Sequence, residues 1–92
     1  MYKTVYKYPL IISGINEIMM PENAEILTVQ VQDETPCLWA LVDIKETQKM
    51  RLFEVYGTGH PIYYEMGIER KYISTFQLHE LGLVFHVFEF KN

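Results

Sequence analysis

Residues 25–42, EILTVQVQDETPCLWALV, carry the clearest secondary-structure signal in the chain. Residues 25–32 alternate apolar and polar side chains, which is the two-residue period of a β-strand with one buried face. Residues 33–36, DETP, have the composition of a turn. Residues 37–42 are apolar on both faces, which is typical of a central strand. The two segments are therefore predicted to form a β-hairpin.

The alternation also predicts which side chains of this hairpin are buried. One face of the first strand is expected to lie in the core and the other to meet solvent or a ligand. The single tryptophan, Trp39, lies in the central strand and is predicted to be a core residue. The face predicted to be buried consists of Leu27, Val29 and Val31.

Similar patterns predict five more strands, the first two of which stop at a proline. The last two are expected to form a second hairpin. Between the third and the fourth, a segment that fits neither the helical nor the strand period is predicted to be irregular. The five strands are predicted at residues 5–8, 15–20, 49–56, 72–78 and 83–90.

Seven strands with short connections predict an all-β fold, either a small antiparallel sandwich or a partly closed barrel. Residues 1–92 are expected to form a single domain. The composition is 49% hydrophobic, so apolar surface is expected to be left over, which favours a homo-oligomer. If no strand covers the final one, its Phe85, Phe88 and Phe90 would pair with another subunit.

Charge and composition exclude several classes of protein. The formal net charge of -4 disfavours a protein that holds long nucleic acid, but it leaves room for a small anionic ligand in a local basic pocket.

The single cysteine, Cys37, is expected to be a buried, inert thiol, so no disulfide is predicted. The three histidines have no metal-site spacing, so neither a metal nor a cofactor is expected. No stretch is apolar and long enough to cross a membrane, and this indicates a cytoplasmic protein.

A glycine-containing loop, Tyr56-Gly57-Thr58-Gly59-His60, is the one stretch with the composition of a binding site. Its successive backbone N–H groups would converge on an anion, with the threonine hydroxyl and the histidine as further donors. The loop lacks the spacing of a Walker or dinucleotide-binding motif. The alternative is that the glycines serve only a bulge or a tight turn.

Tyrosine rings would complete such a site, because seven tyrosines are too many for a core of this size. Tyrosine rings stack on nucleobases with about 1 to 3 kcal/mol per base. Tyr56 and Tyr8 are the predicted rings, and Arg51 is predicted to place a cation beside them.

No catalytic residues are predicted. Ser74, His60 and Asp43 could be combined into a nucleophilic set, but no motif surrounds the serine and such trios occur by chance. His86 lies among apolar neighbours and is expected to be a partly buried histidine with its hydrogen bonds satisfied. The sequence therefore favours a binding protein over an enzyme.

Six segments together resemble a family of short proteins encoded by tailed bacteriophages. The resemblance covers nearly the whole chain and implies a phage protein expressed in the cytoplasm of an infected bacterium. It carries over no functional residue. The segments are YKYPL at 6–10, VQVQ at 29–32, PCLWALVD at 36–43, YGTGH at 56–60, YISTFQ at 72–77 and LVFHVFE at 83–89.

Two classes of function are open at this point. In the first, the protein binds and sequesters a small nucleotide-derived immune signal of the host, using the glycine loop for phosphate and the tyrosines for the base. In the second, it is a protein-interaction module that inhibits a host protein through an exposed strand edge or an aromatic surface. A minor component of the virion is a further alternative.

Overall fold

The computed structural model describes residues 2–12 and 14–91, and within them it contains seven β-strands and one short 3₁₀ turn, His79–Leu81. The all-β prediction is confirmed, and each predicted strand has its counterpart within two residues at either end. None of the described helical segments is long and apolar enough to cross a membrane. The strands are β1 (Thr4–Pro9), β2 (Ile15–Pro21), β3 (Glu25–Gln32), β4 (Thr35–Val42), β5 (Gln48–Gly57), β6 (Arg70–Leu78) and β7 (Leu83–Phe90).

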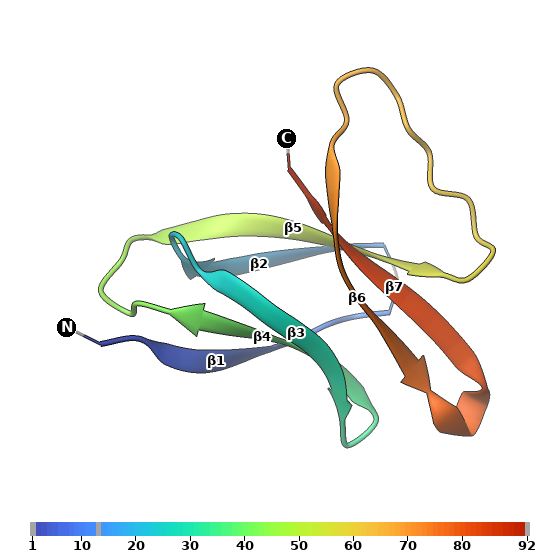
Figure 1. Cartoon of the computed structure of the whole chain (residues 1–92), viewed down its shortest axis with the longest axis horizontal. Coiled ribbons are helices and arrows are strands. Elements are labelled where there is room, and N and C mark those ends of the chain that lie inside the picture. The colour runs from blue at the N-terminus through green and yellow to red at the C-terminus, as the bar shows by residue number, and fades with distance from the viewer. Residues whose placement is uncertain (1, 13, 92) are drawn as a thin grey trace.

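The strands form two antiparallel sheets (Figure 1). A three-stranded sheet has the order β1-β4-β3, and a four-stranded sheet has the order β2-β5-β7-β6. β3, at the edge of the first sheet, lies close to β6, at the edge of the second, but no ladder joins them. The sheets are therefore not closed into a barrel, and the arrangement is compatible with a sandwich.

Both predicted hairpins are present, β3 with β4 and β6 with β7. β4 lies between β1 and β3, as its two-sided apolar pattern predicted. β7 also lies inside its sheet, between β5 and β6. Its phenylalanines are thus not on a free edge, and the route to an oligomer through that edge is absent. A homo-oligomer itself stays a prediction.

The core lies between the two inner faces. Directly opposed residues of antiparallel strands project to the same side of a sheet, so the register assigns each residue to a face. Phe53 of β5 and Val87 of β7 are fully buried against Leu38 and Ala40 of β4. Burying a side chain of this size contributes about 1.5 to 3 kcal/mol. This interface between the sheets holds the module together.

A bulge in β3 changes the predicted buried face. Ile26 opposes Ala40, whereas Thr28 opposes Trp39, so Leu27 is an extra residue in its strand. An extra residue reverses the alternation. Ile26 and Val29 therefore face the core, while Leu27 is 47% exposed. The prediction that Leu27 is buried was wrong for this reason, and Val31 is also exposed at the end of the strand.

Trp39 is not a core residue either. The register places it opposite Lys7 and Thr28, on the outer face of the three-stranded sheet. It is half-buried there, and the Lys7 ammonium lies 5.8 Å from its ring centroid. Cys37 is buried, as expected.

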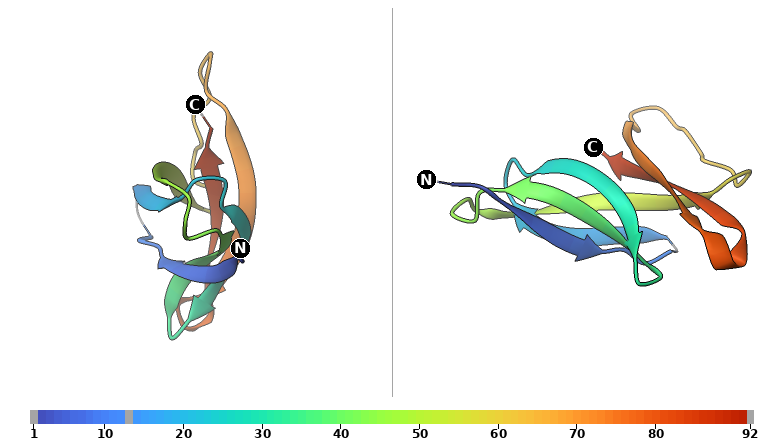
Figure 2. Two further views of the ribbon diagram at one scale, coloured as in Figure 1. Left: turned by 90° about the vertical axis from the view of Figure 1, so that its left-hand side faces the viewer. Right: turned by 60° about the horizontal axis from the view of Figure 1, so that its bottom comes forward.

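The connection between β5 and β6 has no regular secondary structure, as predicted for this segment. Figure 2 shows it projecting beyond the two sheets. Several of its side chains are exposed, and the connection begins at the glycine loop, residues 56–60, and ends at β6.

Candidate functional site

The glycine loop does not form the predicted anion cradle. The backbone N–H of Thr58 donates to the carbonyl oxygen of Val84 at 3.2 Å, and that of His60 donates to the carbonyl oxygen of Gly57 at 3.1 Å. The first bond extends the pairing of β5 with β7 by one residue, and the second closes a tight turn. The prediction of three convergent free donors, the amides of Gly57, Thr58 and Gly59, therefore fails at Thr58, whose amide is engaged within the sheet.

The two glycines of the loop differ in backbone conformation and in their surroundings. Gly59 has φ of 87°, a conformation that residues with a side chain rarely adopt. At Gly57 a Cβ atom would lie 2.9 Å from the ring of His60, an exposed side chain that can turn aside. The tight turn, which was the alternative interpretation of this loop, thus explains the glycine at position 59.

A chain of hydroxyl and imidazole groups runs across the sheet beside the loop. Thr58 Oγ1 lies 2.7 Å from His86 Nε2, and His86 Nδ1 lies 2.9 Å from Thr75 Oγ1. Thr75 Oγ1 is in turn 2.7 Å from the hydroxyl of Tyr72. Because hydroxyls donate as well as accept, they suit either tautomer of the imidazole. His86 is thus a half-buried histidine with both nitrogens satisfied, as predicted.

Tyr56 belongs to a second polar cluster on the same side of the sheet. Its hydroxyl donates to Glu54 Oε2 at 2.6 Å, and Arg70 Nε donates to Glu54 Oε1 at 2.7 Å. Arg70 also donates to the backbone oxygen of Tyr63 at 2.8 Å, and its guanidinium lies 4.8 Å from the Tyr64 ring. Burial, and then the hydrogen bond to Glu54, raise the pKa of Tyr56 above 10.0. Its hydroxyl serves the cluster rather than a ligand.

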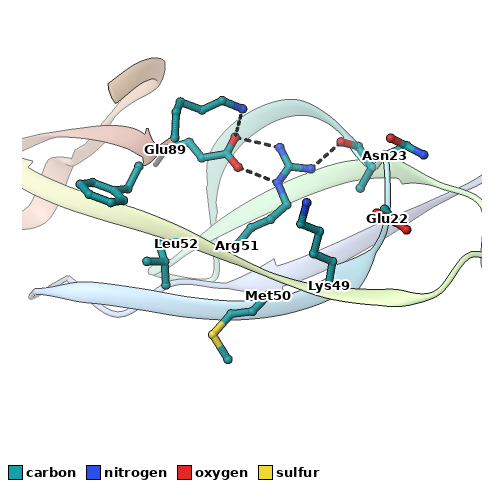
Figure 3. Close-up of a pocket in the computed structure, with 10 residues that line it drawn as sticks. Glu22, Asn23, Lys49, Met50, Arg51, Leu52 and Glu89 are labelled. Atoms are coloured by element: carbon teal, nitrogen blue, oxygen red, sulfur yellow. Dashed lines mark hydrogen bonds and ion pairs between the residues drawn. The ribbon is translucent and has the colours of Figure 1, made fainter. Parts of the chain in front are cut away.

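Arg51 lies on the opposite side of the sheet from Tyr56. Its Nε and one terminal nitrogen donate to the two carboxylate oxygens of Glu89 at 2.6 and 2.8 Å. Its other terminal nitrogen donates to the backbone oxygen of Ala24 at 2.6 Å. Figure 3 shows this pair at the wall of a hollow of about 460 Å³, with Lys49 beside Arg51.

Tyr8 is remote from all of these residues. It lies on β1, in the other sheet, opposite Leu38, and it packs against the core. Burial, together with the nearby Tyr6, raises its pKa above 10.0. The predicted site residues therefore fall into three places. Residues 56–60 are contiguous, Arg51 faces the interior, and Tyr8 belongs to the three-stranded sheet.

The structure also displays a broad apolar surface; leftover apolar surface was predicted from the composition, but its location was not. We call it the outer face: the side of the four-stranded sheet that points away from the core. The missed signal was that β5 and β7 are apolar on both faces, although only one face meets the other sheet. The register assigns to the outer face Ile15, Glu17 and Met19 of β2, Met50, Leu52, Glu54 and Tyr56 of β5, Arg70, Tyr72 and Thr75 of β6, and His86, Phe88 and Phe90 of β7.

The outer face is apolar and partly open to solvent. Ile15, Met19, Met50 and Tyr72 are each between 49% and 62% exposed. The aromatic ring of Phe88 meets those of its neighbours edge to face, at centroid distances of 5.7 and 6.1 Å. Among the described residues, no group of three histidine, cysteine or acidic side chains could hold a metal ion.

The fold and these surfaces define a small all-β module of two antiparallel sheets, with an exposed apolar outer face on the four-stranded sheet. A family model described as a domain of unknown function, DUF7352, matches residues 1–92. The chain belongs to this family. No curated protein and no solved structure matches it significantly.

Proposed function

We propose that the protein is a non-catalytic interaction module that binds another protein through the outer face. The observation that carries this proposal is an exposed apolar sheet surface with almost no free charge. Its only unpaired charged side chain among the assigned residues is Glu17, because Glu54 and Arg70 neutralise each other. Exposed apolar surfaces of this kind are typical of interaction sites.

The residue types of the outer face fit a protein partner. Interface cores are enriched in tyrosine, phenylalanine and methionine and depleted of charged residues. The outer face carries Met19 and Met50 next to an aromatic row, so both features are present. Nucleic acid would need a basic surface, which the outer face lacks.

The connection between β5 and β6 extends the same surface. Tyr63, Tyr64 and Met66 are 73%, 62% and 103% exposed. The hydrogen bond from Arg70 to the backbone of Tyr63 fixes the connection to the outer face. Exposed tyrosines held in place in this way lose little conformational freedom on binding, which favours their use as anchors.

A strand edge borders the outer face on its other side. β2 is the last strand of the four-stranded sheet, so one row of its backbone groups is unpaired within the described chain. A partner strand could pair with that row while its side chains contact Ile15 and Met19. The resemblance to tailed-bacteriophage proteins supports a host protein as this partner, inside the bacterium.

Sequestration of a nucleotide-derived signal is the weaker candidate. Its support was the set of amides around Thr58, one of which is bonded to β7. Titration of the purified protein with cyclic and ADP-ribose-type nucleotides by calorimetry tests it. Heat of binding that disappears in His60→Ala would restore this candidate above the interaction module.

The experiment for the interaction module has three arms. In the first arm, covalent cross-linking in bacterial lysate identifies a partner protein. The two purified proteins are then mixed, and light scattering tests whether they form a complex of fixed stoichiometry. In the second arm, Met50→Lys and Tyr72→Glu on the outer face are expected to weaken the complex roughly tenfold or more. The matched control is Val5→Lys, because Val5 is 49% exposed on the other sheet.

Light scattering of the protein alone is the third arm. A stable dimer that Met50→Lys dissociates would mean that a second copy covers the outer face, and the proposal of a different protein would be overturned. Equal weakening by Val5→Lys and Met50→Lys would overturn the assignment of the face.

A further inference from the structure

The hollow beside Arg51 borders the outer face, from which Met50, Leu52 and Phe90 contribute to its lining, but its charged side chains lie on the opposite side of the sheet. Lys49 and Arg51 alternate along β5 with Met50 and Leu52, so the two basic side chains point toward the other sheet. The walls of the hollow come from β5, from β7 and from the turn between β2 and β3, which supplies Asn23. Figure 3 shows Lys49 and Arg51 rising from the same side of β5, with the guanidinium of Arg51 directed toward Glu89.

Basic side chains gather around this hollow. A second hollow of about 190 Å³ adjoins it and shares Arg51 and Glu89 with it. Together the two linings hold four of the eight basic residues and three of the twelve acidic residues of the chain, Glu22, Glu25 and Glu89. The lining is therefore net positive by one, whereas the rest of the chain carries a net charge of -5.

The charges of the hollow are arranged so that cations remain available. Glu89 is paired with Arg51 through two hydrogen bonds. Lys91 Nζ is 3.8 Å from Glu89 and its side chain is 44% exposed. Within the part of the chain that the structure describes, Lys49 makes no ion pair. Lys49 is thus free to turn toward an added anion, and the exposed Lys91 can do so by leaving its 3.8 Å contact with Glu89.

We propose that this hollow binds a small phosphorylated molecule, with Lys49 and Lys91 contacting the phosphoryl oxygens beside the fixed Arg51–Glu89 pair. Lysine binds phosphate as a mobile point charge, and a hollow of about 460 Å³ is within the usual size range of small-molecule sites. Along β5, Lys49 and Arg51 alternate with Met50 and Leu52 of the surface proposed for a protein partner, so the charged groups of the site lie on the other side of the strand.

The ionisation of Glu89 is consistent with an environment that stabilises negative charge. Burial alone would raise the pKa of this carboxyl, but hydrogen bonding and charge from Arg51, with further contributions from Lys91 and Lys71, hold it below 4.5. Because Glu89 already compensates the charge of Arg51, the positive charge left for an added anion is that of the lysines.

The test uses pyrophosphate as the probe, added to the ¹⁵N-labelled full chain at low salt. Amide shifts are expected to concentrate at Asn23, Lys49 and Lys91. The double variant Lys49→Gln/Lys91→Gln is expected to bind pyrophosphate at least about tenfold more weakly, as when two charged contacts are lost. Raising the salt concentration is expected to weaken binding by the wild-type chain.

The matched control is Lys3→Gln/Lys45→Gln, which removes the same charge at two exposed positions outside the hollow. Unchanged binding by this control supports the site. Equal weakening in both double variants, or shifts spread over all lysines, would overturn it and leave only a non-specific charge effect. Because the substituted lysines are exposed, thermal unfolding is expected to be the same for both doubles. If pyrophosphate does not bind in the hollow, the outer-face proposal is unaffected, because the test of that proposal substitutes different residues.

Discussion

Two buried arginine–glutamate pairs lie on opposite faces of the four-stranded sheet. Arg51 and Glu89 face the interior, and Arg70 and Glu54 lie on the outer face. The shortest distances from arginine Nε to a carboxylate oxygen are nearly equal, at 2.6 and 2.7 Å, and both glutamates are buried. The chemistry of the two pairs is the same, so their different surroundings decide what each one does.

The surroundings differ in two respects. The interior arginine reaches the backbone of Ala24, just before β3, and so ties the two sheets together, whereas Arg70 reaches Tyr63 and ties the long connection to the sheet. Glu89 also has Lys71 and Lys91 nearby, while Glu54 has the hydroxyl of Tyr56. The charge of Glu54 in the outer pair is thus stabilised by one cation, Arg70, whereas the charge of Glu89 is stabilised by Arg51 and two lysines.

The largest effect is expected from Arg70→Met. Glu54 would stay buried with the Tyr56 hydroxyl as its remaining hydrogen-bond donor in the cluster, and an unpaired buried charge costs about 3 to 5 kcal/mol of unfolding free energy. Urea unfolding at pH 7 measures the loss. Hydrogen exchange in residues 61–69 is expected to accelerate as well.

The double variant Arg70→Met/Glu54→Met is the control for that experiment. Apolar replacement of a buried ion pair is often close to neutral, so the double variant is expected to recover much of the stability. A loss of less than about 1 kcal/mol in the single variant would show that water solvates Glu54 and would contradict this account.

Arg51→Met is expected to cost less, about 2 to 3 kcal/mol, because two lysines remain to stabilise the Glu89 charge. Urea unfolding of both variants compares the loss of unfolding free energy caused by removing each arginine. Lys45→Met removes one exposed cation and is expected to change stability by no more than about 0.5 kcal/mol. If Arg51→Met proved the more damaging variant, the role assigned to the neighbouring lysines would be wrong.

Tyr56→Phe removes one hydrogen bond from the outer pair and keeps the ring. Hydrogen bonds to charged groups contribute about 1.5 to 3 kcal/mol, but Arg70 still compensates the carboxylate, so we expect a loss of about 1 kcal/mol. Thermal unfolding of the variant and of the wild type measures this loss of stability. Tyr72→Phe is the comparison, since its hydroxyl bond is exposed and its loss should be nearly neutral.

Acid provides the mildest perturbation of the interior pair. The pKa of Glu89 is lower in the folded protein than its ordinary value of 4.5, so the folded state binds this proton less well than the unfolded chain. Its contribution to stability is complete above pH 4.5 and is lost as the pH falls through the folded pKa. Urea midpoints from pH 7 to pH 3 should therefore fall less steeply in Glu89→Gln than in the wild type. Parallel curves would argue against the depressed pKa.

The strands were predictable because a local pattern specifies them. Alternation, prolines and polar turns located all seven within two residues. The bulge in β3 was not predictable in the same way, since Leu27 is apolar and continues the pattern. Only the pairing with β4 determines that it points outward. The position of β7 inside its sheet depends likewise on pairing with β5 across the long connection.

The site was harder to predict because its contacts join distant residues. Arg51 and Glu89 are 38 positions apart, and nothing local to either one indicates the other. The amide of Thr58 illustrates the opposite error, where a local motif suggested free donors and a distant carbonyl, that of Val84, engages one of them. Local reasoning identified His86 correctly because its apolar neighbours already implied partial burial.

The central position of β7 has a consequence for biosynthesis. β5 and β6 leave the ribosome first, yet neither can enter the four-stranded sheet next to the other until residues 83–90 have been made and inserted between them. Until then β6 and one edge of β5 lack their β7 partner, and strands with unpaired backbone are the kind of species that chaperones bind. The four-stranded sheet can therefore be completed only after residues 83–90 have been synthesised.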